Sequence, residues 1–177
     1  MVAIGDSITV AFASCLLPQP CPRNSWSTGD SDRDYSHYER IRALNPAIGG
    51  HATNLAVPGA RAGAMAGQAR AAVATGAEYV TLLVGANDVC RPAVADMTSA
   101  ADFRAQVDEA LRVLKEGLPK AKVFVASIPD VYRLWEVGHG NDTVVRVWNQ
   151  GCARACWPTR PPTRRRTARA GRTCATG

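Results

Sequence analysis

The chain has 177 residues, 46% of them hydrophobic and 20% charged, a composition that suits one domain with a sizeable core. No apolar run approaches the roughly eighteen residues of a membrane-spanning helix, and Met1 leads straight into an expected strand rather than into a signal peptide. The net charge of +6 comes from residues 152–177, which hold seven arginines and no acid. The other 151 residues carry 14 basic and 15 acidic residues, so their charge does not indicate a nucleic-acid or membrane surface.

The first expected element is a short buried strand over residues 2–4, which turns sharply through Gly5 and Asp6. The turn places Ser7 at the C-terminal edge of a sheet, where α/β proteins bind their ligands. The mostly apolar residues 8–14 are expected to form a helix or a structured loop. A serine on such a turn offers a hydroxyl nucleophile and an N–H donor to the same space, as acyl transfer requires. Taken alone, Gly-Asp-Ser also fits an ordinary turn.

Strand-like and helix-like segments then alternate along the chain. A polar surface loop is expected over 23–34, helices over 36–44 and 64–75, and strands over 51–57 and 79–84. The strongest helix is capped by Thr98 or Ser99 and ended by Gly117 and Pro119, and its apolar face consists of Phe103, Val107, Ala110, Leu111 and Leu114. A further buried strand is expected over 123–127. This alternation predicts an α/β fold with a parallel, doubly wound sheet and flanking helices.

Three polar or glycine positions follow three of these strands. Ser7 follows the first strand, Gly59 the second and Asn87 the third, so all three are expected at the same edge of the sheet. The Ser7 N–H, the Gly59 N–H and the Asn87 side-chain amide could converge on one oxygen, as an oxyanion hole requires. Each residue alone has a plainer interpretation, since Gly59 follows Pro58 in a turn and Asn87 also suits a turn.

The blocks GDSIT at 5–9, NLAVPGARAG at 54–63 and VTLLVGAND at 80–88 together resemble the first three blocks of the SGNH (GDSL-type) esterase and lipase family. Over about residues 2–150 the chain looks most like secreted, cysteine-containing lipases and acylhydrolases of actinobacterial type. The resemblance implies a flavodoxin-like three-layer fold, with Ser7 as nucleophile and with Ser7, Gly59 and Asn87 as oxyanion donors. It also implies an acyl-enzyme formed from a small-molecule or lipid ester without a metal or cofactor, in a secreted protein that we expect to be a monomer.

Two other classes of serine enzyme are excluded by the residues around Ser7. The nucleophile elbow Gly-x-Ser-x-Gly of α/β-hydrolases is absent, because Thr9 occupies the position of the second glycine. A chymotrypsin-like protease continues Gly-Asp-Ser with a glycine and places its serine last in chain order, whereas here the serine comes first.

The family's fourth block, Asp-x-x-His near the C-terminus, is missing from this sequence, whose histidines are His37, His51 and His139. Asp34 and His37 have the right spacing but precede the second block, so we interpret that match as a coincidence. We expect His139 on a loop after the fourth strand. Without a base a serine hydroxyl is a poor nucleophile. The sequence therefore allows a serine esterase or a catalytically dead α/β domain that only binds ligands in the same cleft.

The C-terminal region differs from the rest of the chain. From Gly151 on there is no Leu, Ile, Val, Phe or Met, so we predict a disordered tail over 151–177 and a hydrolase domain over 1–150 that lacks its last strand. An out-of-frame reading of GC-rich DNA after Gln150 would produce such a composition. The alternative is an arginine-rich arm for nucleic acid or another anionic surface, although no interleaved aromatic residues support it and nucleic acid is not the expected partner.

Six cysteines favour an oxidising compartment. We expect a disulfide between Cys15 and Cys21, which bracket a small loop. Cys90 is expected to lack its natural partner, because the resemblance implies that its family counterpart pairs with a cysteine beyond Gln150, and Cys152 or Cys156 are the candidates to replace it. Cys152, Cys156 and Cys174 lack the spacing of a zinc site, so no metal is expected.

Overall fold

The centre of the molecule is a parallel sheet, in a computed structural model that describes residues 1–32 and 35–151. Within these residues its strands are β1 (Val2–Gly5), β2 (Thr53–Asn54), β3 (Tyr79–Leu83) and β4 (Lys122–Val125), in the order β2-β1-β3-β4. Every pairing is parallel, and Gly5 at the end of β1 pairs with Leu83 at the end of β3. The predicted α/β fold with a parallel sheet is confirmed.

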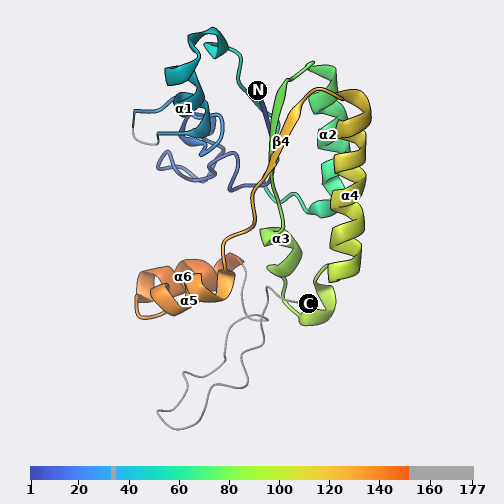
Figure 1. Cartoon of the computed structure of the whole chain (residues 1–177). Helices are drawn as coiled ribbons and strands as arrows, with labels where there is room; N and C mark the ends of the chain where they lie inside the picture. The colour runs from blue at the N-terminus through green and yellow to red at the C-terminus, as the bar shows by residue number, and fades with distance from the viewer. Residues whose placement is uncertain (33–34, 152–177) are drawn as a thin grey trace.

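Helices cover both faces of the sheet (Figure 1). α2 (Met65–Ala74) and α4 (Ala100–Gly117) lie side by side on one face, and α1 (His37–Leu44) lies on the other. The remaining helices are α3 (Ala86–Val89), α5 (Val131–Gly138) and α6 (Asp142–Gly151), together with the short 3-10 helices η1 (Pro22–Asn24), η2 (Pro46–Ile48), η3 (Ala62–Ala64) and η4 (Val94–Asp96).

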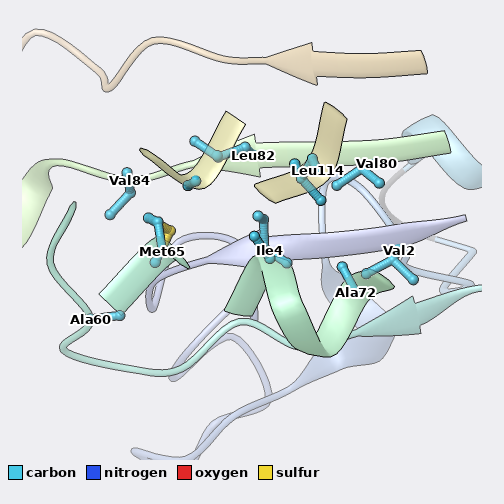
Figure 2. Packing of buried hydrophobic residues seen from close by; sticks show 11 residues of the cluster. Val2, Ile4, Ala60, Met65, Ala72, Val80, Leu82, Val84 and Leu114 are labelled. Atoms are coloured by element: carbon cyan, nitrogen blue, oxygen red, sulfur yellow. The ribbon is translucent and has the colours of Figure 1, made fainter. Parts of the chain in front are cut away.

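The hydrophobic core fills the space between the sheet and the α2–α4 layer. Figure 2 shows Ile4 from β1, Leu82 from β3, Met65 from α2 and Leu114 from α4 pointing toward one another, and all four are buried. Burial of a side chain of this size stabilises the fold by about 1.5–3 kcal/mol. Because α2 is rich in alanine, it can pack closely on α4 and on β1.

The opposite face of the sheet is held by polar and aromatic contacts. The buried hydroxyls of Thr81 in β3 and Ser27 are hydrogen-bonded at 2.6 Å. His37 at the start of α1 lies edge-on to the rings of Tyr79 and Phe124, and its Nε2 is 3.1 Å from the Tyr79 hydroxyl. Among the described residues, polar and aromatic contacts therefore cover β3 and β4 on this face.

The helices α1 and α4 begin close to where the sequence predicts them, because their capping residues are recognisable. The hydroxyls of Ser36 and Ser99 accept hydrogen bonds from Glu39 N and Asp102 N, as N-caps do. The predicted strand over 51–57 is shorter than expected, since only Thr53 and Asn54 pair with β1. The helices α5 and α6 were not predicted.

The expectation that the strand over 123–127 is buried is wrong. β4 is the outermost strand of the sheet formed by the described residues, and Val123, Phe124 and Val125 are 38%, 43% and 49% exposed. In the sheet formed by the described residues, β4 therefore has strand β3 on one side and no further strand on the other. The predicted disordered tail over 151–177 begins one residue too early, because Gly151 is the last residue of α6, and the rest of it lies outside the residues that the structure describes.

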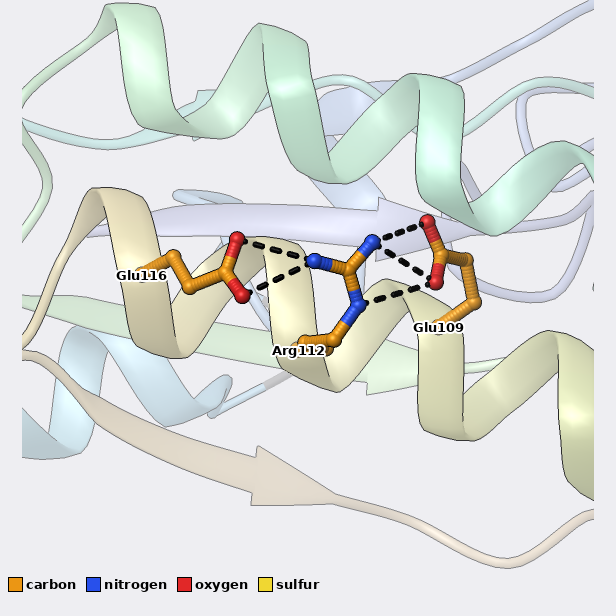
Figure 3. Close-up of polar contacts among 3 residues, drawn as sticks. All are labelled: Glu109, Arg112 and Glu116. Carbon is orange, nitrogen blue, oxygen red and sulfur yellow. Dashed lines mark hydrogen bonds and ion pairs between the residues drawn. The ribbon is translucent and has the colours of Figure 1, made fainter.

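The solvent-facing surface of α4 carries a small charge network (Figure 3). Arg112 donates hydrogen bonds to Glu109 on one side, at 2.7 Å, and to Glu116 on the other, at 2.8 Å. The hydrogen bond from Arg112 lowers the pKa of Glu109. These groups are exposed, so solvent screens the network and it adds little to stability.

Candidate active site

The turn that carries Ser7 can form only with glycine at position 5. Gly5 has φ of +151°, and a Cβ there would collide with the carbonyl oxygen of Leu83 and lie 2.6 Å from Thr9 Oγ1. After it, Asp6 is fully buried and its Oδ1 accepts the Ile8 N–H at 2.9 Å. The Asp6 carbonyl oxygen accepts the Thr9 N–H, so Ser7 is held half-buried at the top of a tight turn.

The main chain just before this turn is fixed by one side chain from α2. The Gly5 N–H donates to Gln68 Oε1 at 2.7 Å, and Gln68 Nε2 donates to the Gly5 carbonyl oxygen at 2.9 Å. Gln68 is a buried polar residue on the same helix face as Met65, Ala69 and Ala72. It therefore supplies the acceptor for the Gly5 N–H and a further donor to the Gly5 carbonyl oxygen at the end of β1.

The loop that carries Gly59 starts beside the same strand end. The Val57 N–H donates to the Gly5 carbonyl oxygen at 3.1 Å, and the Ala60 N–H donates back to the Val57 carbonyl oxygen at 3.0 Å. Gly59 lies between them with φ of +81° and is exposed. The positive φ favours glycine at this position even though a Cβ would meet no neighbouring atom.

Asn54, at the end of β2, ties the start of this loop to the other face of the sheet. Its Nδ2 lies 3.0 Å from the Thr9 carbonyl oxygen and 2.9 Å from Thr28 Oγ1, and its Oδ1 accepts the Ala56 N–H. Beyond Asn54 the chain still donates to β1, from Leu55 N–H to the Ala3 carbonyl oxygen and from Val57 N–H to the Gly5 carbonyl oxygen. The Gly5 N–H, however, donates to Gln68 Oε1 instead of back to this segment, which accounts for the early end of β2.

Two adjacent side chains in α3, just after β3, hold the Gly59 loop. Asn87 Nδ2 donates to the Ala60 carbonyl oxygen at 3.0 Å, and the buried carboxylate of Asp88 accepts the Ala62 N–H at 3.0 Å. Asp88 also accepts the Thr98 hydroxyl at 2.7 Å and lies 3.7 Å from the Arg61 guanidinium. The Gly59 loop is therefore fixed to α3 on both sides of Arg61.

The structure thus brings the predicted site residues to one edge of the sheet. Ser7, Gly59 and Asn87 follow β1, β2 and β3, which are neighbouring strands, and hydrogen bonds join the Gly59 loop both to Gly5 and to Asn87. Among the hydrogen bonds between described residues, the Ser7 and Gly59 N–H groups have no acceptor. Two unused N–H donors next to a serine turn can receive a developing negative charge.

Burial makes the Asp6 carboxyl hard to ionise. Its pKa is raised, mainly by burial and in smaller part by the nearby Asp88 carboxylate, while the hydrogen bond from Ile8 N–H acts in the opposite direction. Its Oδ2 has no hydrogen-bond partner among the described residues. Asp6 and Asp88 are therefore two buried carboxyl groups close to the candidate site residues. Of the two, only Asp88 has several hydrogen-bond donors and a guanidinium to balance its charge.

His37 and His139 lie in different parts of the fold relative to Ser7. Tyr79, the partner of His37, is the first residue of β3, whereas Ser7 follows the last residue of β1, so His37 lies toward the opposite edge of this parallel sheet. Asp34, the other residue of the matching spacing, lies outside the described residues. His139 directly follows α5, is exposed, and its Nδ1 contacts the Glu136 carbonyl oxygen at 2.9 Å.

The predicted disulfide between Cys15 and Cys21 is confirmed, with Cα atoms 5.9 Å apart. Cys90 is also disulfide-bonded, so it is not left as a free thiol. Cys152 and Cys156, the candidates named for its partner, lie outside the described residues. The described part of the chain contains no group of three or more His, Cys, Asp or Glu that could hold a metal ion.

An apolar cavity of about 820 Å³ lies beside α3, between α4 and the ends of β3 and β4. It is bordered by Val84, Val89, Met97, Phe103, Val107 and Ile128. Gly85 and Asp88, which flank the Asn87 turn, also border it, so the cavity adjoins the third strand end of the site.

Comparison with known proteins identifies the family. Residues 3–163 match the model of the GDSL-like Lipase/Acylhydrolase family. The chain belongs to this family. It is also similar to the human protein "Phospholipase B1, membrane-associated", at 27% identity over 181 residues, and the match covers 86% of this chain but only 12% of that relative. Membership of the GDSL-like family supports an ester-hydrolase function in general terms.

None of the helices in the described part of the chain is long and apolar enough to cross a membrane. The Cys15–Cys21 disulfide is compatible with an extracellular location.

Sequence reasoning missed Gln68, Asp88, Arg61 and Thr98, which position the site rather than form it. A signal was present for Gln68, because it is a polar residue at a core-facing position of an otherwise alanine-rich helix. Asp88 was visible only as the last residue of a turn motif, and its partners come from distant parts of the sequence.

Proposed function

We propose that this GDSL-like family member hydrolyses carboxylic esters through an acyl-enzyme on Ser7. The observation that carries the proposal is the attachment of the Gly59 loop to Asn87 beside the Ser7 turn. In the proposed reaction Ser7 Oγ attacks the ester carbonyl carbon, and the oxyanion is stabilised by the Ser7 N–H, the Gly59 N–H and the Asn87 amide. The alcohol then leaves with a proton, and water hydrolyses the acyl-serine.

The weakest part of this site is the base that must take the Ser7 proton. His37 lies toward the opposite sheet edge and His139 is exposed beyond α5, so neither is assigned to this step. A small base added to the solution can replace a missing side chain. Imidazole is therefore expected to accelerate the Ser7-dependent reaction.

For the acyl group we propose an apolar chain, which the cavity beside α3 would accommodate. The printed name of the human relative, a phospholipase, also favours a lipid ester. Because the cavity is lined mainly by aliphatic and aromatic side chains, each additional methylene buried there should favour binding by about 0.8 kcal/mol until the cavity is filled.

The test is a series of p-nitrophenyl esters from acetate to dodecanoate, with and without imidazole, for the wild-type chain and for Ser7→Ala. We expect a Ser7-dependent rate that rises with imidazole and with chain length. Val107→Phe, which narrows the cavity, should reduce the rate with the long esters and leave acetate unaffected. Equal rates for the wild type and Ser7→Ala would contradict the enzyme proposal and favour a domain that only binds ligands.

We also propose that the protein acts outside the cytosol, as the Cys15–Cys21 disulfide supports. Its formation in cells can be tested by thiol labelling after expression in the cytosol and in the bacterial periplasm. Labelling of both cysteines in periplasmic protein would contradict the proposal.

A further inference from the structure

The segment that follows Ser7, residues 8–21, exposes an unusual amount of apolar surface. Leu16 is 99% exposed, Leu17 58%, Phe12 41% and Ile8 37%. We call this segment the 8–21 loop. Single exposed apolar residues are normal on protein surfaces, but four within one short loop concentrate apolar surface in one segment, as at sites that contact a partner.

The 8–21 loop is held in this shape rather than left open. The Cys15–Cys21 disulfide closes it, the Cys21 N–H donates to the Val10 carbonyl oxygen at 3.1 Å, and the Ala13 N–H donates to the Gln19 carbonyl oxygen at 2.9 Å. Asn24 Nδ2 supports it from η1 through the Ser14 carbonyl oxygen at 3.2 Å. These contacts hold Leu16 and its neighbours away from the core.

The backbone of the loop is also strained at three positions, of which Ala13 and Leu16 are exposed. Ala11, Ala13 and Leu16 have φ of +52°, +62° and +73°, in the left-handed region that residues other than glycine rarely adopt. Such strain persists only where the surrounding structure enforces it, and it is concentrated at functional sites. The fold thus holds Leu16 exposed to solvent in spite of the free-energy cost of this backbone conformation.

The charge of the segment indicates what kind of surface it meets. Between Asp6 and Arg23 the sequence contains no charged residue. A segment that is apolar and uncharged can enter the boundary between lipid headgroups and acyl chains without removing a charge from water. It would bind by burial of apolar surface rather than by attraction to anionic lipids.

We propose that the 8–21 loop docks the protein on the neutral surface of a lipid aggregate and so brings Ser7, the residue next to the loop, to ester bonds in that surface. The choice of a lipid surface rests on the proposed function, whereas docking itself requires no catalysis. Insertion of a fully exposed leucine changes a partition coefficient by on the order of tenfold or more.

The experiment measures co-sedimentation of the full chain with phosphatidylcholine vesicles at high salt. High salt shortens the screening length and suppresses binding through the arginines of residues 152–177. The wild type should bind, and the double variant Leu16→Ser, Leu17→Ser should lose at least about tenfold of its partition coefficient. Binding should not increase when anionic lipid is added, since the 8–21 loop carries no charge.

The matched control is Leu44→Ser. Leu44 is 90% exposed, but it is the last residue of α1. From there the chain runs through η2 to the start of β2, whereas the 8–21 loop follows the end of β1, which is parallel to β2. This variant should bind like the wild type, and so should Ser7→Ala, which separates docking from catalysis. Equal binding by the double variant and the wild type, or no wild-type binding, would overturn the docking proposal and leave the ester-hydrolase proposal to its own assay.

Discussion

Replacement of Gln68 by methionine tests how the end of β1 is held in front of Ser7. Methionine has a similar length and shape but neither donor nor acceptor groups of comparable strength. The variant leaves the buried Gly5 N–H without its acceptor, which costs about 1–3 kcal/mol, and removes a second bond to the Gly5 carbonyl oxygen, worth about 0.5–1.5 kcal/mol. That oxygen keeps the Val57 N–H, so it is not left without a partner.

The expected loss for Gln68→Met is therefore about 1.5–4.5 kcal/mol of unfolding free energy. Urea denaturation followed by circular dichroism measures it. With a slope of about 2 kcal/mol per molar urea, a loss of about 3 kcal/mol lowers the midpoint by about 1.5 M. Since domains of this kind are stable by only about 5–15 kcal/mol, the change should be easy to detect.

Gln68→Glu provides the internal control. The ionised carboxylate of this variant still accepts the Gly5 N–H but cannot donate to the Gly5 carbonyl oxygen, and it buries a charge. The protonated carboxyl carries both a donor and an acceptor. The stability of the variant should therefore approach that of the wild type as the pH falls toward about 4. A loss below about 0.5 kcal/mol for Gln68→Met, or no pH dependence for Gln68→Glu, would refute the proposed clamp on Gly5.

Two further substitutions test the site directly. Because the pKa of Asp6 is raised above its ordinary 3.8, its contribution to stability is complete below that value and is lost as the pH rises through the folded-state pKa. Asp6→Asn should therefore gain stability relative to the wild type as the pH rises above about 3.8 in urea melts, and parallel pH curves would contradict this. Asn87→Ala should lower kcat for a p-nitrophenyl ester on the order of 10²–10³-fold with little change in KM, and an unchanged kcat would remove Asn87 from the oxyanion hole.

The parts of the fold that were predictable from the sequence are those determined by local patterns. The β-branched, apolar run of β3 is almost entirely buried, and Ser99 caps α4 as expected. Ser36, expected as the first residue of a helix, is the N-cap of α1. β2 was overestimated because the Gly5 N–H donates to Gln68 rather than back to the chain after Asn54, although Leu55 and Val57 still donate to β1. That contact joins residues far apart in the sequence, and no periodicity could reveal it.

The same distinction applies to the site. Ser7, Gly59 and Asn87 could be placed on one sheet edge because each follows a recognisable strand. The residues that fix them could not be found in this way. Asp88 accepts bonds from Ala62 and Thr98, and both partners depend on the path of loops whose conformation the sequence pattern does not determine.

Apolar packing and directional hydrogen bonds act on different parts of this protein. This difference explains why the strand ends could be predicted and the residues that fix the site could not. Apolar packing of Ile4, Leu82 and Leu114 is non-directional, so it can bring β1 and β3 under the helices without fixing the orientation of the main chain beyond the strand ends. Hydrogen bonds from main-chain groups to Gln68 and Asp88 are directional, so they can fix the turns that carry Ser7 and Gly59. Substitutions in the first group should change stability with little change in site geometry, whereas those in the second should alter the site even where the sheet stays intact.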